Sequence, residues 1–301
     1  MSAPTYTSTT RPLDAIAAGV VVVLCLSWGV NQVAAKFAIH EIPPLTQAAA
    51  RSLAAALLIA AWCRLRGIAL FARDGTLWYG IAAGVLFAIE FILIYQGLLY
   101  TTATRAILFI YLAPFFVVLG ARVLLPADRF KLAQWLGLGL SFVGMLIAFG
   151  VPMPALDPRQ LIGDVMMIIA ALFWAATTLI IKATPLTRAS AEKVMLYQLV
   201  ISGPIMAAAA IVAGERMISL PSAMALGSLV YQTVWVVSVT YVVWFALIAR
   251  FSASRLSAFT FLTPLFGVAA GHVLLGEPLT PAFAAAVVMV AAGLVLVNRS
   301  R

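Results

Sequence analysis

One carboxylate in this chain stands in surroundings where an ionised group is costly. Glu90 lies between Ile89 and Phe91, deep inside a long apolar stretch. A charge in that position costs several kcal/mol unless it is paired, hydrated or protonated. We therefore expect Glu90 either to take part in proton coupling or to bind a cationic group of a ligand. The alternative is a protonated acid that is hydrogen-bonded to a neighbouring helix.

Two tryptophans, Trp28 and Trp174, lie in the middle of apolar stretches, and each has polar residues one helical turn away. These polar neighbours are Asn31 and Gln32 in the first case and Thr177 and Thr178 in the second. Residues three and four apart share a helix face, so each helix presents an aromatic ring beside hydrogen-bonding groups. This combination suits a ligand with a ring and polar ends. The alternative is packing between helices.

Further aromatic residues extend this pattern, and we expect Tyr95, Tyr111, Tyr241 and Phe259 to line the same cavity, with packing as the alternative. Pro114 and Pro264 fall near the middle of two apolar stretches. A proline inside a helix removes a backbone hydrogen bond and bends the helix. These two prolines are predicted hinges, with static curvature as the alternative.

The elements that hold these residues must lie in a membrane. Hydrophobic residues make up 64% of the 301 residues, and charged residues only 10%. A water-soluble domain could not cover so much apolar surface. A helix that crosses a bilayer needs about 20 apolar residues, and the runs are too continuous for barrel strands. Ten spans are predicted: 14–39, 44–66, 75–98, 103–125, 131–149, 161–183, 192–214, 223–249, 254–275 and 281–298.

The net charge of +9 is explained by orientation in the membrane. With ten spans and a cytoplasmic N-terminus, fourteen of the 19 Lys and Arg residues fall on the inner side and five on the outer side. This bias predicts that both termini are cytoplasmic, in a bacterial inner membrane. The excess of Lys and Arg over Asp and Glu therefore requires no nucleic-acid partner. We expect the lipid bilayer and a small molecule as partners, and a monomer, with a dimer as the alternative.

The chain contains the same pattern twice. Trp28 and Lys36 are eight residues apart, as are Trp174 and Lys182; Arg105 precedes Pro114 by nine residues, as Arg255 precedes Pro264. Five spans in each half would place the second half upside down relative to the first. The prediction is an all-α membrane protein with two inverted five-helix repeats, 1–150 and 151–301, around a central cavity.

This pattern resembles the drug/metabolite transporter superfamily, specifically its EamA-type ten-helix branch. The resemblance is carried by 27–31 (SWGVN), 43–51, 103–105, 111–116 (YLAPFF), 173–174, 261–264 (FLTP) and 276–278 (GEP). The aromatic content and Tyr95-Gln96-Gly97 further resemble the YddG-like aromatic amino-acid exporters. The resemblance implies amino acids, aromatic ones among them, as substrates.

Other functions are less well supported by the residues. A membrane enzyme needs a convergent catalytic set, whereas His40 and His272 are the only histidines, and neither HExxH nor CxxC occurs. A channel usually has a repeated filter, and ATP-driven transport needs a nucleotide-binding loop. The sequence contains neither pattern. We therefore expect a secondary transporter that works by alternating access and has neither cofactor nor metal. Lys182 and Arg51 are expected to extend towards the membrane surface, or, for Arg51, to pair with Asp164.

Overall fold

The computed structural model describes residues 13–70, 72–125, 128–150, 157–276 and 279–299. Within these residues, ten helical segments are long and apolar enough to cross a membrane, which confirms the predicted number and positions of the spans. Their elements are α1 (Ala15–Ile39), α2 (Pro44–Leu65), α3 (Leu77–Gly97), α4 (Ala103–Ile110), α5 (Ala113–Leu124), α6 (Leu132–Phe149), α7 (Pro158–Ala183), η1 (Pro185–Arg188), α8 (Ala191–Val212), α9 (Ala223–Val230), η2 (Tyr231–Thr240), α10 (Tyr241–Arg250), α11 (Ala253–Phe259), α12 (Leu262–Leu275) and α13 (Pro281–Arg299).

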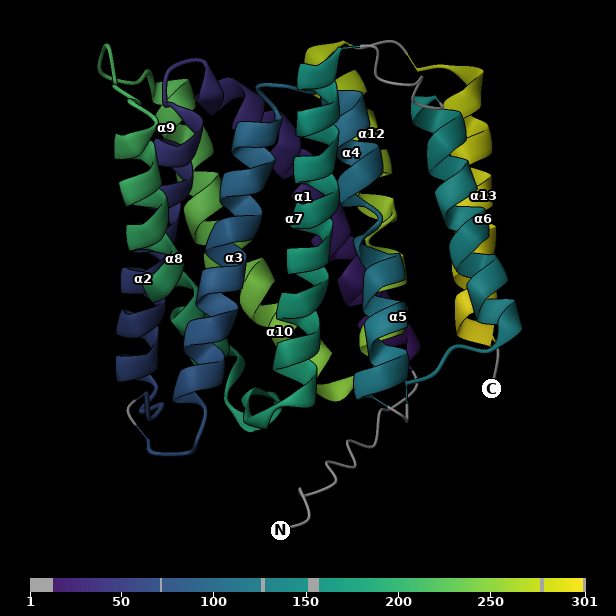
Figure 1. Cartoon of the computed structure of the whole chain (residues 1–301), viewed down its shortest axis with the longest axis horizontal. Helices are drawn as coiled ribbons and strands as arrows, with labels where there is room; N and C mark the ends of the chain where they lie inside the picture. Colours follow the sequence, from purple (N-terminus) through teal and green to yellow (C-terminus); the bar gives the residue numbers. More distant parts are fainter. Residues whose placement is uncertain (1–12, 71, 126–127, 151–156, 277–278, 300–301) are drawn as a thin grey trace.

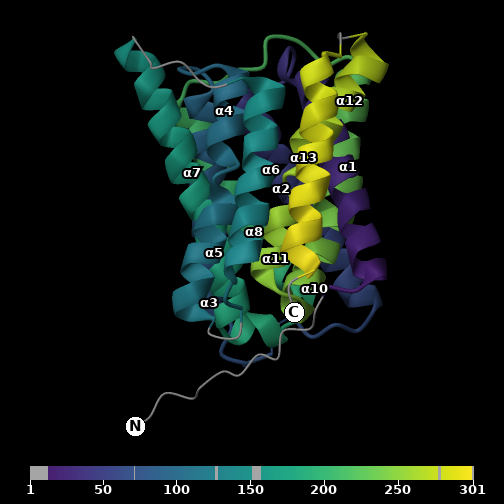
Figure 2. The same cartoon turned by 90° about the vertical axis from the view of Figure 1, so that its right-hand side faces the viewer.

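The helices stand roughly parallel in one bundle. In Figure 1, α2 and α8 form one flank and the pair α6 and α13 forms the other. The helices α1, α3, α4, α7, α10 and α12 fill the centre between these flanks. Figure 2 shows α6 and α13 side by side at the front, with α2 behind them. The helix α1 begins at the lower end of the bundle in Figure 1, α7 begins at the upper end, and α13 ends at the lower end.

Close helix contacts depend on small residues. A Cβ added at Gly29 of α1 would lie 2.7 Å from the backbone nitrogen of Gly267 in α12. Towards the flank formed by α2 and α8, a Cβ added at Gly84 of α3 would lie 2.6 Å from the Cβ of Ile201 in α8. Glycine therefore permits these helices to approach at a distance that alanine would prevent.

Spans four and nine are both interrupted at the predicted hinge positions. The helix α4 ends before Tyr111, and α5 begins two residues later with Pro114 in its first turn. In the same way, α11 ends at Phe259, and Pro264 is the third residue of α12. A proline is tolerated in the first turn, where the missing N–H has no helical partner. Each span is thus two short helices joined at mid-depth.

Span eight contains a feature that the sequence pattern does not indicate. Between α9 and α10 the chain forms ten residues of π-helix, η2. The hydroxyl of Ser238 donates to the carbonyl of Thr233, five residues earlier, at 2.7 Å. π-Helical segments are uncommon and often occur at functional sites. Of the residues at 276–278 that carry the family resemblance, Glu277 and Pro278 lie outside the described residues.

Candidate functional site

A cavity of about 420 Å³ lies in the centre of the bundle, a volume within the range of small-molecule sites. It is lined by residues from α1, α2, α3, α4, α7, α8, α10 and α12, together with Tyr111 at the break in span four. Helices from both halves of the chain therefore surround it. Spans one, three, four, six, eight and nine line it, and α2 and α8 contribute in addition.

The cavity lining includes residues at the ends of α1 and α3, which lie at the upper end of the bundle in Figure 1. Ile39 and Leu98 lie there and are 36% and 37% exposed. At the other end of the cavity the core is closed: Cys25, Phe259 and Phe261 are all buried. Among the described residues, the cavity lining near the upper end is thus partly exposed, whereas the core below the cavity is buried.

One wall of the cavity is aromatic. The indole nitrogen of Trp28 donates to the hydroxyl of Thr240 at 2.9 Å, which joins α1 to η2. The Trp28 ring makes edge contacts with Tyr241 and Trp244, with ring centroids 5.9 and 5.3 Å away. Trp174 makes the same kind of contact with Tyr111 at 5.8 Å. Such edge contacts hold the rings in defined orientations.

Where α2 meets α3, ionisable side chains line the cavity beside aromatic rings. Arg51 is only 3% exposed and lines the cavity, with its guanidinium carbon 4.5 Å from the centre of the Phe91 ring. Glu90, 7% exposed, lies close enough to Arg51 for an electrostatic interaction. Gln198 of α8 completes this region of the wall. The cavity therefore combines an aromatic wall with a pair of opposite charges.

Two expectations for Arg51 are wrong. Its side chain does not extend to the membrane surface, because it packs on Phe91 inside the bundle. It does not pair with Asp164 either: that carboxylate accepts hydrogen bonds from Thr101 at 2.6 Å and from Arg105. Ionisable residues inside a membrane span are usually functional, and this rule applies to Arg51 as it does to Glu90. The rule could therefore have identified Arg51 as a cavity residue from the sequence.

Ten of the eleven predicted substrate-binding residues line the cavity. They are Trp28, Asn31, Gln32, Glu90, Tyr95, Tyr111, Trp174, Thr177, Thr178 and Tyr241. The exception is Phe259, which is buried below the cavity, where its carbonyl oxygen accepts a contact from the Cys25 thiol at 3.4 Å. Within the described part of the chain, the Glu90 carboxylate makes none of the hydrogen bonds to a neighbouring helix that the alternative interpretation requires. Arg51, Gln198 and Trp244 are lining residues that the prediction omitted.

Buried polar contacts close the lower end of the bundle. Asp128, after α5, accepts hydrogen bonds from the Ser252 hydroxyl and, at 3.2 Å, from the backbone nitrogen of Ser254 at the start of α11. Burial raises the pKa of the Asp128 carboxyl, and these hydrogen bonds act in the opposite direction. Lys182 does not extend to the surface as expected; it is 2% exposed and donates to the carbonyl of Ala249 at 3.1 Å.

At the open end, the connections of the two halves bind each other at the rim. Glu215, after α8, accepts hydrogen bonds from the backbone nitrogens of Leu45 and Thr46 at 2.9 and 2.7 Å, at the start of α2. Glu41 accepts two hydrogen bonds from Ser222, and these lower the pKa of its carboxyl. Hydrogen bonds from the α8–α9 connection to Glu41 and to the start of α2 thus hold the rim together.

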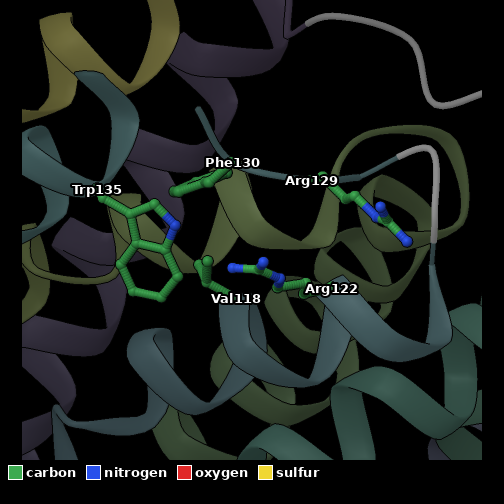
Figure 3. Close-up of a pocket in the computed structure, with 5 residues that line it drawn as sticks. All are labelled: Val118, Arg122, Arg129, Phe130 and Trp135. Carbon is green, nitrogen blue, oxygen red and sulfur yellow. The ribbon is translucent and has the colours of Figure 1, made fainter. Parts of the chain in front are cut away.

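A second, smaller cavity of about 170 Å³ lies where α5 ends and α6 begins (Figure 3). It is lined by Val118, Arg122, Arg129, Phe130 and Trp135. Both arginines are exposed. An exposed basic group beside a tryptophan near a helix end is typical of a membrane–water interface. The central cavity, which is larger and has buried charges, is the better candidate for a ligand site.

Comparison with protein families shows to which family the chain belongs. The model of the EamA-like transporter family matches residues 15–150 and again residues 161–299. The chain belongs to the EamA-like transporter family. Its ten apolar helices and central cavity are therefore those of a multi-pass membrane transporter.

Proteins named as transporters are similar to this chain over most of their length. The chain is 27% identical to a probable amino-acid metabolite efflux pump of Salmonella typhimurium, over 89% of both chains. It is 25% identical to the uncharacterized transporter YvbV of Bacillus subtilis, over 91% of this chain and 89% of that one. An uncharacterized transporter of Archaeoglobus fulgidus is 26% identical over 80% of this chain and 83% of its own.

The fold also has a solved counterpart. A crystal structure superposes with a TM-score of 0.80, covering 94% of this chain and 96% of that chain at 17% identity. At this identity the likeness shows the fold alone. The evidence for function therefore comes from the family, the relatives and the cavity.

Proposed function

We propose that this protein is a secondary transporter that exports amino acids, including the aromatic ones, by alternating access. The observation that carries the proposal is the composition of the central cavity, which places aromatic rings beside Arg51 and Glu90. An aromatic amino acid has a matching ring and matching charges. The similarity to a probable amino-acid metabolite efflux pump supports the same substrate class. The alternative is export of other small metabolites or drugs.

Alternating access requires that one end of the cavity opens while the other closes. The breaks at Pro114 and Pro264 supply two points at mid-depth where a span can bend. In the proposed mechanism the contacts of Asp128 with Ser252 and Ser254 release when the lower end opens, and bending of spans four and nine closes the upper end. The two halves, 1–150 and 151–301, act as inverted repeats in this motion. The two separate matches of the family model support that division.

The protein is proposed to reside in a bacterial inner membrane with both termini in the cytoplasm, following the distribution of Lys and Arg. The open end of the cavity then faces outwards. An exporter in this state is ready to release its substrate. Monomers suffice for this mechanism, because one chain surrounds the whole cavity.

Counterflow in liposomes tests the proposal. Purified protein is reconstituted with unlabelled tryptophan or phenylalanine inside the vesicles, and uptake of the labelled amino acid is measured. Saturable counterflow is expected, because a carrier exchanges one occupied state for another. Flux that rises linearly with concentration would instead indicate a channel. Absence of saturable flux for every amino acid in a complete panel would contradict the proposed substrate class.

A further inference from the structure

Arg51 is a buried cation with unused hydrogen-bond donors. Its Nε and Nη2 atoms are buried and have no hydrogen-bond partner. Buried polar groups in proteins are nearly always hydrogen-bonded, because an unpaired one loses the hydration it had in water. A buried arginine with empty donors on the wall of a cavity therefore indicates a site whose partner is a ligand.

The geometry of the group indicates which ligand fits. A guanidinium presents a planar fork of N–H donors that matches a carboxylate with two parallel hydrogen bonds. Stacking of the guanidinium on Phe91 at 4.5 Å holds its plane in one orientation. Glu90 immediately precedes Phe91 on α3 and also lines the cavity. Its carboxylate interacts with Arg51 electrostatically, but the two side chains form no salt bridge within the described residues.

Free acceptors complete the site. The side-chain oxygens of Gln198 and Asn31 are buried without a hydrogen-bond donor, and both residues line the cavity. Together with Glu90 they supply acceptors for an ammonium group, which has three donors. A ligand with a carboxylate beside an ammonium carries groups that complement both Arg51 and these acceptors.

We propose that Arg51 binds the carboxylate of the substrate and Glu90 its ammonium, so that the cavity selects zwitterionic α-amino acids over analogues that lack either charge. This inference rests on the proposed function and deepens it. It makes Arg51 a determinant of specificity that acts separately from the aromatic wall.

The experiment compares three indole compounds as inhibitors of labelled tryptophan counterflow: tryptophan, tryptamine, which lacks the carboxylate, and indole-3-propionate, which lacks the ammonium. For the wild-type protein, tryptophan is expected to inhibit at least about tenfold more strongly than either analogue, since each charged hydrogen-bonded pair contributes at about this level. In Arg51→Gln the preference for tryptophan over tryptamine should disappear. In Glu90→Gln the preference over indole-3-propionate should disappear.

Two further variants keep the result interpretable. Arg51→Lys retains the charge without the planar fork and should restore part of the preference. Arg64→Gln removes an exposed arginine from the same helix and should leave the preference unchanged. If Arg51→Gln does not fold, Arg51→Lys carries the test, and an unchanged preference in it together with wild-type affinity contradicts the inference.

The outcomes separate the two proposals. Saturable tryptophan counterflow with equal discrimination in wild type and Arg51→Gln would overturn the role of Arg51 and leave the proposed function standing. Absence of saturable flux with any amino acid in the wild-type protein would overturn both.

Discussion

Trp28 is the residue at which the first span and the eighth span meet. Its indole nitrogen donates to Thr240, and its ring packs against Tyr241 and Trp244. The side chain therefore holds the aromatic wall in place as well as forming part of it. A second tryptophan, Trp174, also lines the cavity but makes its ring contact with Tyr111.

Replacing Trp28 by Phe should separate these two roles. The ring remains, but the hydrogen bond to Thr240 is lost, which should lower the free energy of unfolding by about 1 kcal/mol. Tryptophan counterflow should fall, and Trp28→Ala should abolish it. Chemical denaturation in micelles and counterflow in liposomes measure the two effects. Trp78→Phe, at a ring that is 77% exposed, is the control, and an equal effect there would contradict the assignment.

At the scale of helices, the contact between α1 and α12 depends on the absence of a side chain at Gly29. A Cβ there would lie 2.7 Å from the nitrogen of Gly267 and 2.7 Å from the Cβ of Phe266. Both neighbours are fixed by their helices, so the substitution must push the helices apart. This contact lies next to the cavity, because Gln32 follows one turn later on α1 and packs against Gly267.

Gly29→Ala should lower the free energy of unfolding by about 1–3 kcal/mol, as overpacking does in other tight contacts. Gly19→Ala is the matched control in the same helix, since nothing lies within 4 Å of a Cβ at that position. It should raise stability by about 0.5–1 kcal/mol, because alanine is the better helix former. Denaturation of both variants in the same micelles measures the difference. Equal stability of the two variants would refute the close contact.

The connection between α2 and α3 is attached to α8 by an ion pair. The ammonium of Lys193 lies 2.7 Å from a carboxylate oxygen of Asp74, which also accepts a hydrogen bond from the Thr76 hydroxyl. These contacts lower the pKa of Asp74 to about 2. The unfolded chain binds a proton at a pH near 4, whereas the folded chain does so only near 2. The pair therefore contributes its full stability above about pH 4 and loses it as the pH falls towards 2.

Asp74→Asn should lower the thermal midpoint of the protein in detergent at pH 6, because the nearly buried Lys193 ammonium loses its carboxylate partner and keeps only the Ala72 carbonyl as an acceptor. The difference between wild type and variant should shrink as the pH is lowered from 4 towards 2. The expected loss is modest, on the order of 1 kcal/mol, since the Asp74 side chain is 39% exposed. A difference that stays constant over this range would show that the carboxylate charge does not contribute.

At the scale of the whole molecule, five spans per half determine which loops share a side of the membrane. The α2–α3 connection and the connection before α7 should lie on opposite sides. Single cysteines at Arg66→Cys and Arg159→Cys test this, in a chain whose own Cys25 and Cys63 are replaced by alanine. An impermeant maleimide added to whole cells should label position 159 directly and position 66 only after permeabilisation. Labelling of both from the same side would contradict the inverted repeat.

Some features of this protein are determined by local sequence. The ten spans follow from runs of apolar residues, since the length and hydropathy of a run decide whether it can cross a bilayer. The breaks at Pro114 and Pro264 follow from the ring of proline itself. The central position of Trp28, Glu90 and Trp174 in their spans also follows from counting along each run, and this was enough to place them on the cavity.

Only the tertiary structure decided which face of each helix points into the bundle. In a membrane, lipid and protein interior are both apolar, so the sequence pattern hardly distinguishes the face of a helix that points inwards. Arg51 and Lys182 were therefore expected at the surface, although packing places both inside. Phe259 was expected on the cavity, yet the break at Thr260 leaves it in the core below. Arg51 and Glu90 come to line one cavity from two helices because α2 and α3 present these faces to the same space.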